Sequence, residues 1–276
     1  MPLNLMYITN DVNIAKTAEK CGVNRIFVDM EYIGKELRQG GMNTVQNHHT
    51  LNDVKNMRET LSTAELLVRC NPIHEETAEY CSSEKEINNI ILNGADYIML
   101  PYFKKTEEVK RFLNIVNARC KTVLLFETPE AVENIEEILD LEGIDEVFIG
   151  LNDLSLGYHK KFMFELLADG TVEKIALKIR EKNIPFGFGG IAAVGKGTLP
   201  AEKIIREHYR MFSQSVILSR SFCDTKTVTD LEEIRKIFEN GIREIRDVEK
   251  ECTVYQKFFL ENMRSIQQTI NDMNLK

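Results

Sequence analysis

The 276-residue sequence has no tryptophan. It also has no apolar run near the about 18 residues that a membrane-spanning helix needs. Basic residues are not in excess: 35 Lys and Arg stand against 43 Asp and Glu, and the net charge is −8. An acidic surface argues against nucleic acid or an anionic membrane as the main partner. We therefore expect a soluble protein whose partners are small molecules.

The six cysteines include no Cys-x-x-Cys pair, which argues against a zinc knuckle or a thiol redox motif. The amino-terminal residues do not resemble a secretory signal peptide. We interpret the cysteines as reduced thiols and expect a cytoplasmic protein.

Short apolar runs alternate with stretches whose apolar residues recur at helical spacing. Several runs are apolar on both faces, as strands buried in a parallel sheet are. The predicted strands are Leu3–Thr9, Arg25–Glu31, Leu66–Asn71, Tyr97–Tyr102, Lys121–Thr128, Glu146–Gly150, Ile184–Gly190 and Ser215–Phe222. The helices predicted between them include Asp11–Cys21, Leu51–Leu61, Ser83–Leu92, Lys105–Ala118, Pro129–Leu139 and Ala201–Tyr209.

This alternation predicts an α/β fold, a (β/α)8 TIM barrel over residues 1–228. A doubly wound open sheet is the alternative. Residues 229–276 are highly charged, helical in pattern and free of proline. They are too long for an eighth barrel helix alone, so we expect a helical extension that packs on the barrel or on a partner subunit. Thr128 and Pro129 predict a helix start, and Ser82 or Ser83 with Glu86 predicts a capping box.

Two acidic residues stand where neighbouring predicted strands end. Glu127 follows Leu124-Leu125-Phe126, and Asp153 lies in the loop after Glu146–Gly150. In a barrel these ends meet at one rim, so we expect both carboxylates to face the same cavity. Two close carboxylates repel each other, and Mg2+ or Mn2+ relieves the repulsion because it prefers oxygen ligands. The alternative is a helix-cap Glu and a turn Asp, each satisfied by backbone amides.

Arg69 ends the third predicted strand on the same rim, where its guanidinium can bind a carboxylate or enolate oxygen. Asp29 and Glu31 end the second strand, and their period-two spacing puts both on one side of it. One of them is a candidate catalytic acid and the other a partner for Arg69; we assign Asp29 to catalysis and Glu31 to substrate binding. A purely structural salt bridge across the barrel mouth is the alternative.

These residues lie in segments that resemble a known family: IFVDMEYIGKELRQ, LLVRCNP, GADYIMLPYF, FETPEAVENIEEIL and GIDEVFIGLNDLSLG. They are similar to the pyruvate-using class II (metal-dependent) aldolase and citrate lyase β-subunit family, of the phosphoenolpyruvate/pyruvate-binding TIM barrel superfamily. The resemblance covers roughly residues 22–222, and the ETPEAV and VFIGxNDLS motifs are its specific part. It implies a carbon–carbon lyase or aldolase that forms or cleaves a 2-oxo acid through a pyruvate-type enolate. It implies further that Glu127 and Asp153 hold Mg2+, Mn2+ or a similar metal, and that Arg69 binds the pyruvyl carboxylate or enolate.

One position departs from the family pattern. Aldolases of this family carry a histidine as catalytic base directly after the acidic motif of the second strand, and this sequence has Tyr32 there. His48 or His49, in the long polar loop 34–50, is a candidate replacement, and we assign the catalytic role to His49. A water molecule on the metal is another candidate base. An exposed polar loop without a catalytic role is the alternative.

The stretch GFGGIAAVGKGT, residues 187–198, imitates two nucleotide-binding motifs. Both patterns follow the seventh predicted strand instead of the first, and Gly197 stands where a P-loop needs Ser or Thr. Barrels often bind phosphate in this loop, so Lys196 and the exposed amides are a candidate substrate-binding site for an anionic group. A flexible lid that needs glycine for its conformation is the alternative.

The missing histidine keeps two other functions open. One is an acyl-CoA lyase of the citryl-CoA or malyl-CoA type, with Lys35, Arg38 and Lys196 as candidate cations at the rim. The other is a non-catalytic barrel that binds a carboxylate. For the enzyme we expect a small 2-oxo acid and an aldehyde or acyl-CoA as partners. The resemblance implies a homo-oligomer, for which the helical extension would suit an interface.

Overall fold

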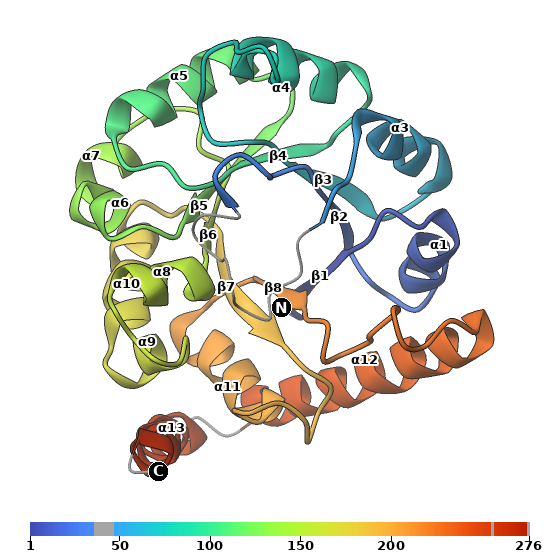
Figure 1. The fold of residues 1–276 in the computed structure, drawn as a ribbon. Helices are drawn as coiled ribbons and strands as arrows, with labels where there is room; N and C mark the ends of the chain where they lie inside the picture. Colours follow the sequence, from blue (N-terminus) through green and yellow to red (C-terminus); the bar gives the residue numbers. More distant parts are fainter. Residues whose placement is uncertain (36–46, 255–256, 275–276) are drawn as a thin grey trace.

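The computed structural model describes residues 1–35, 47–254 and 257–274. Parallel strands form a closed barrel in which each strand pairs with the next along the chain, and β8 pairs with β1 (Figure 1). The predicted (β/α)8 barrel is therefore confirmed, and the open sheet is wrong. The strands are β1 (Asn4–Ile8), β2 (Arg25–Asp29), β3 (Glu65–Arg69), β4 (Tyr97–Leu100), β5 (Lys121–Phe126), β6 (Glu146–Ile149), β7 (Phe186–Ile191) and β8 (Ser215–Leu218).

Helices surround the barrel (Figure 1). None in the described ranges is long and apolar enough to cross a membrane. They are α1 (Val12–Lys20), α3 (Leu51–Thr60), α4 (Ser83–Leu92), α5 (Thr106–Val116), α6 (Pro129–Glu133), α7 (Ile135–Leu139), α8 (Leu151–Gly157), α9 (Glu165–Ala168), α10 (Thr171–Glu181), α11 (Ala201–Met211), α12 (Leu231–Val254) and α13 (Lys257–Asn274).

Two local predictions about helix starts had different outcomes. Thr128 caps α6 as predicted, because its side chain accepts a hydrogen bond from the backbone N–H of Ala131. Ser82 caps α4, but the predicted capping box is wrong, because a cap at Ser82 puts Lys85 at the third helical position. The side chain of Glu86 accepts hydrogen bonds from Asn71 instead.

Strand side chains alternate between the barrel interior and the layer beneath the helices. Phe27, Leu67 and Leu125 belong to a small apolar cluster inside the barrel. Two residues further along the chain from each of these come Asp29, Arg69 and Glu127. The first two end their strands, and Glu127 directly follows its strand. The same alternation therefore points these three side chains into the mouth at the carboxyl ends of the strands.

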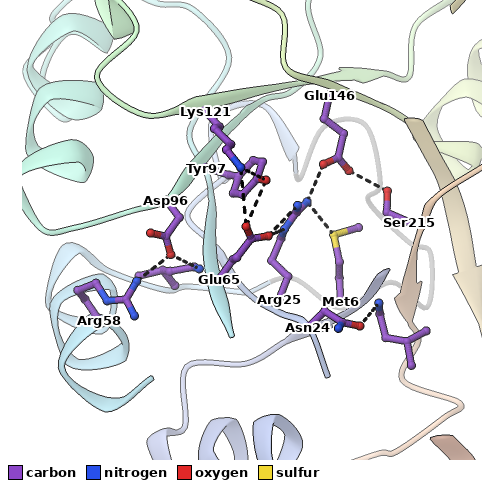
Figure 2. A network of polar contacts seen from close by, with 12 residues as sticks. Met6, Asn24, Arg25, Arg58, Glu65, Asp96, Tyr97, Lys121, Glu146 and Ser215 are labelled. Carbon is purple, nitrogen blue, oxygen red and sulfur yellow. Dashed lines mark hydrogen bonds and ion pairs between the residues drawn. The ribbon is translucent and has the colours of Figure 1, made fainter. Parts of the chain in front are cut away.

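The mouth at the amino-terminal ends of the strands is filled by a polar network (Figure 2). Arg25 donates to Oε2 of Glu65 at 3.1 Å and to Oε2 of Glu146 at 3.0 Å. Its guanidinium carbon lies 3.8 Å from the ring centroid of Tyr97. Ser215 donates to the other oxygen of Glu146 at 2.7 Å. These contacts satisfy the buried charge of Arg25 and close this end of the barrel.

The last two helices pack on the barrel's own outer helices (Figure 1). Helix α12 lies against α1 and α11, and α13 lies against α9 and α11. Helix α12 also holds the chain before β1: Oε1 of Glu249 accepts from the N–H of Leu3 at 2.6 Å, and Arg246 donates to the carbonyl of Leu3 at 3.0 Å. A domain boundary near residue 228 and a contact with a partner subunit stay predictions.

Candidate active site

The predicted site residues gather at the carboxyl ends of β2, β3, β5 and β6. Asp29 and Arg69 are the last residues of β2 and β3 and are direct neighbours in the strand register. Glu127 follows β5. Asp153 lies in the first turn of the short helix α8, so the predicted loop position is wrong. The helix begins directly after Gly150, which turns the chain at the end of β6.

Arg69 is held by the two carboxylates that end β2. Its Nε and Nη2 each lie 2.8 Å from the oxygens of Asp29, and its Nη1 lies 3.3 Å from Oε2 of Glu31. Lys35 contacts the same two side chains, at 2.9 and 3.4 Å. Burial alone would raise the pKa of Asp29, but Arg69 and Lys35 hold it below its usual range. Asp29 therefore stays ionised and is a weak base. The salt bridge that the sequence left as an alternative is present.

His49 is buried next to this cluster and contacts Asp29 through the backbone. Its Nδ1 accepts a hydrogen bond from the N–H of Asp29 at 3.0 Å. Burial lowers the pKa of His49 although Asp29 is near, so the neutral imidazole is favoured. In this arrangement His49 positions the backbone of Asp29, and its predicted catalytic role stays a prediction.

Glu127 and Asp153 line one cavity of about 480 Å3. They are 5% and 7% exposed. Oε1 of Glu127 accepts a hydrogen bond from the backbone N–H of Tyr102 at 3.0 Å. Tyr102 has a φ of 48°, in the left-handed region that non-glycine residues seldom adopt. With this backbone conformation, the N–H of Tyr102 donates to the carboxylate of Glu127.

Gly150 lies against the same carboxylate. A Cβ at this position would come within 2.9 Å of both Cβ and Oε2 of Glu127. Only a residue without a side chain fits here unless Glu127 moves. Sequence reasoning missed Tyr102 and Gly150 as supports for Glu127, although the glycine at the end of the apolar run Val147-Phe148-Ile149 was a usable signal.

The residues of this cavity fit a divalent metal. Mg2+ and Mn2+ prefer oxygen ligands and often bind through one or two carboxylates, with water and substrate as the remaining ligands. Within the described ranges, no group of three or more His, Cys, Asp and Glu residues is arranged to hold a metal ion. Glu127 and Asp153 would therefore be the protein ligands of an open site, and the metal itself stays a prediction.

Tyr32 and His49 line a different cavity, of about 450 Å3. Of the residues that the structure describes, none lines both this cavity and that of Glu127 and Asp153. No histidine is found among the described lining residues of the Glu127 and Asp153 cavity. The candidate imidazole and the candidate metal ligands therefore line two different cavities of the described structure.

The candidate anion loop between β7 and α11 already has partners for two of its amides. The N–H of Gly195 donates to Oε2 of Glu202 at 3.1 Å, and the N–H of Lys196 donates to the carbonyl of Ala193 at 2.9 Å. Gly195 and Gly197 have φ values of 73° and 94°, which agrees with a loop that needs glycine for its conformation. The Lys196 side chain is exposed, and anion binding there stays a prediction.

The cations suggested for a CoA substrate are not equivalent. Lys35 is 4% exposed and is already paired with Asp29 and Glu31, so it is a poor contact for a substrate phosphate. Arg38 lies outside the described residues. Lys196 is exposed.

A family model, that of the HpcH/HpaI aldolase/citrate lyase family, matches residues 5–188 of the chain. A stretch of 85 residues is 32% identical to a 4-hydroxy-4-methyl-2-oxoglutarate aldolase of Chaetomium globosum. That alignment covers 30% of this chain and 32% of the relative, so the match spans about a third of the curated protein.

Solved structures show the same fold. An HpcH/HpaI aldolase/citrate lyase family protein from Burkholderia cenocepacia J2315 superposes with a TM-score of 0.63 at 14% identity, covering 85% of this chain and 95% of that one. The citrate synthase SbnG superposes with a TM-score of 0.61 at 13% identity, covering 85% and 94%. At such identities the likeness concerns the fold alone.

Proposed function

The chain belongs to the HpcH/HpaI aldolase/citrate lyase family, and we propose that it is a divalent-metal-dependent carbon–carbon lyase or aldolase that forms or cleaves a 2-oxo acid. One observation carries this proposal. Glu127 and Asp153 are buried together in one cavity, on the rim that also carries Arg69. A pair of buried carboxylates on this rim suits a hard metal ion that binds a 2-oxo acid.

In this proposal Glu127 and Asp153 hold the metal, which when bound supplies Lewis acidity to stabilise a pyruvate-type enolate. Arg69 adds a fixed positive charge where negative charge develops. Asp29 and Glu31 engage three nitrogens of Arg69 and so orient the plane of its guanidinium.

The supports of these groups are also part of the proposed machinery. His49 acts on Arg69 through the backbone of Asp29. Tyr102 and Gly150 restrict the carboxylate of Glu127 from two sides. A site preorganised in this way needs little rearrangement as charge develops on the substrate.

Exchange of the methyl protons of pyruvate in D2O, followed by NMR, tests the proposal without a choice of aldehyde. We expect exchange that depends on Mg2+ or Mn2+ and is lost in Glu127→Gln. Glu133→Gln is the matched control, because Glu133 lines the same cavity but is exposed, and exchange should persist. Exchange that survives in Glu127→Gln would contradict the assigned ligand.

The same experiment separates the alternatives. Metal binding without pyruvate exchange would favour an acyl-CoA lyase, a larger 2-oxo acid or a carboxylate-binding barrel. Absence of metal binding in the wild type would remove the role given to Glu127 and Asp153.

A further inference from the structure

Asn71 joins the chain after β2 to the end of β3. Its side-chain Oδ1 accepts hydrogen bonds from the backbone N–H groups of Tyr32 at 3.0 Å and Ile33 at 2.9 Å. Asn71 itself stands two residues after Arg69, the last residue of β3, and is 2% exposed. One buried side chain thus satisfies two backbone donors of the neighbouring segment, beyond the point where β2 and β3 end.

Glu31 lies between two attachments of this segment to the end of β3. On one side of it, the N–H of Met30 donates to the carbonyl of Arg69 at 3.0 Å. On the other side, Asn71 holds the N–H of Tyr32. The buried side chain of Glu31 lies 3.3 Å from Nη1 of Arg69. The two attachments therefore set the direction from which Glu31 approaches this guanidinium.

The side chain of Asn71 is held in turn by Glu86, in the first turn of α4. Oε1 of Glu86 accepts from the backbone N–H of Asn71 at 3.1 Å and from Nδ2 of Asn71 at 2.9 Å. Because Nδ2 points to Glu86, Oδ1 points to the N–H groups after β2. The amide of Asn71 cannot flip without losing hydrogen bonds on both sides.

The contact between Glu86 and Asn71 is poorly explained by stability alone. Glu86 is 5% exposed, and its Oε2 is buried without a hydrogen-bond partner in the described structure. A buried carboxylate oxygen without a donor is costly, and burial raises the pKa of Glu86. Proteins tolerate such costs mainly where a group has a task beyond stability. The contact lies directly behind the residues that hold Arg69, which suggests what that task is.

We propose that Asn71, fixed by Glu86, is a positioning residue of the lyase site, because it holds Glu31 where Glu31 orients the guanidinium of Arg69. The effect on catalysis rests on the proposed function, whereas the effect on Arg69 needs neither substrate nor metal. A reacting group misplaced by about 1 Å can cost up to about 10²-fold in rate. The loss should therefore appear in the maximal rate of the reaction.

Asn71→Asp tests the contact because it removes the donor and keeps the size of the side chain and one acceptor oxygen. The new carboxylate would stand against Oε1 of Glu86, in place of a 2.9 Å hydrogen bond, and the two groups should repel each other. Glu86→Gln in the same chain reverses the polarity of the pair, since the glutamine amide can donate to the aspartate. This double variant has the wild-type charge and should restore what Asn71→Asp loses.

The Nε–H group of Arg69 gives a readout that is independent of activity. It donates to Oδ1 of Asp29 at 2.8 Å, so its exchange with water, followed by 15N NMR, should be slow. Its signal is identified by its absence in Arg69→Lys. We expect exchange to quicken at least about tenfold in Asn71→Asp and to return toward the wild-type rate in the double variant. Unchanged exchange in Asn71→Asp would overturn the proposal.

Proton exchange of pyruvate gives the catalytic readout. In Asn71→Asp we expect the maximal rate per folded protein to fall by about 10–100-fold. The affinity for Mn2+ should stay that of the wild type, because Glu127 and Asp153 lie after β5 and β6. A lower urea midpoint with an unchanged maximal rate would show a purely structural role and overturn the proposal. A double variant as impaired as Asn71→Asp would also overturn it.

Two control variants make the same chemical changes at exposed positions. Asn240→Asp on α12 keeps the acceptor for Arg243, and Glu84→Gln lies in the same turn of α4 as Glu86. Both should leave the Arg69 signal and the maximal rate unchanged. If Asn71→Asp does not fold, Asn71→Ser removes the amide without adding a charge and should show smaller changes of the same kind. No change in Asn71→Ser would then overturn the proposal.

The two proposals can fail separately. A wild type that exchanges no pyruvate protons would contradict the proposed function, while the Arg69 signal would still decide the role of Asn71. Wild-type pyruvate exchange with an undisturbed Arg69 signal in Asn71→Asp would overturn only the role of Asn71.

Discussion

The two mouths of the barrel each hold an arginine between two carboxylates. Arg25 lies at the amino-terminal ends of the strands and Arg69 at the carboxyl ends. The side chain of Arg25 is 2% exposed, whereas that of Arg69 is 15% exposed. An arginine and two carboxylates thus form a plug at one mouth, whereas at the other mouth the described residues leave the arginine partly accessible.

The difference lies in where the carboxylates come from. Arg25 on β2 reaches Glu65 on the neighbouring β3 and Glu146 on β6, across the barrel (Figure 2). Arg69 takes both partners from the end of β2. A bridge that spans the barrel closes the mouth, whereas the described bridges of Arg69 stay with the neighbouring strand. The cavity of Glu127 and Asp153 lies at the carboxyl ends of β5 and β6.

Removal of the bridge that Arg25 forms with Glu65 and Glu146 should have the largest effect on stability. We expect Arg25→Met to lower the free energy of unfolding by about 3–5 kcal/mol, because Glu146 would be buried without its charged partner. Urea denaturation measures the loss, and the folded fraction should keep its pyruvate exchange. Arg243→Met, at an exposed position of α12, should change stability by no more than about 0.5 kcal/mol. Similar losses in the two variants would refute a plug at this mouth.

Loss of the bridge between Arg69 and the carboxylates at the end of β2 should affect activity more than stability. Arg69→Lys keeps the charge but loses the paired contact with Asp29. We expect the rate of pyruvate exchange to fall by about 10²–10³-fold, the usual effect of losing one preorganised donor. The urea midpoint should fall less than in Arg25→Met. The distinction between the mouths would be lost if Arg69→Lys were as unstable in urea as Arg25→Met and exchanged the pyruvate protons at the wild-type rate.

Crowding of the cavity of Glu127 and Asp153 should have an intermediate effect. In Gly150→Ala the new Cβ meets Glu127 at 2.9 Å, so we expect an overpacking cost of about 1–3 kcal/mol and weaker Mn2+ binding, measured by electron paramagnetic resonance. Gly170→Ala is the control for backbone strain. Its φ is +80° and its Cβ would meet nothing within 4 Å, so it should lower stability without changing Mn2+ affinity. Equal Mn2+ affinity in Gly150→Ala and wild type would contradict the contact with Glu127.

The smallest effect should appear in the acid dependence of stability. The folded state lowers the pKa of Asp29, so the stabilisation is present above the unfolded pKa of about 3.9 and is lost as pH falls below it. We therefore expect the difference in unfolding free energy between wild type and Asp29→Asn to shrink on acidification, by up to about 1.4 kcal/mol per pH unit. Urea titrations from pH 6 down to pH 3 measure it. A difference that stays constant with pH would place the stabilisation elsewhere.

The mouth at the carboxyl ends of the strands could be predicted from the sequence, because the patterns that indicate it are local. Buried parallel strands appear as apolar runs, and alternation along each run points the residue at its end inward. Asp29 and Arg69 follow from that rule alone, and their pairing follows from the strand register. Asp153 follows from its place after the next apolar run, and the resemblance to the family added its role as a metal ligand. Helix α8 was not foreseen, because its seven residues look like a loop.

The closed mouth could not be predicted in this way. Arg25 and Glu146 are 121 residues apart, and nothing near either residue indicates the other. The partner of Glu86 was missed for a similar reason. A capping box is a local pattern, whereas Asn71 on the preceding loop lies 15 residues away. Tertiary contacts decided both cases.

The contact between Leu3 and Glu249 has a consequence for the order in which the protein is made. The backbone beside the first strand finds this partner 246 residues later. At about 5–20 residues per second, a ribosome needs roughly 12–50 s to synthesise the chain between them. For most of that interval β1 also lacks β8, its second neighbour in the barrel. The first strand of this protein is therefore among the last parts to be completed, and it spends its time on the ribosome as an unprotected edge.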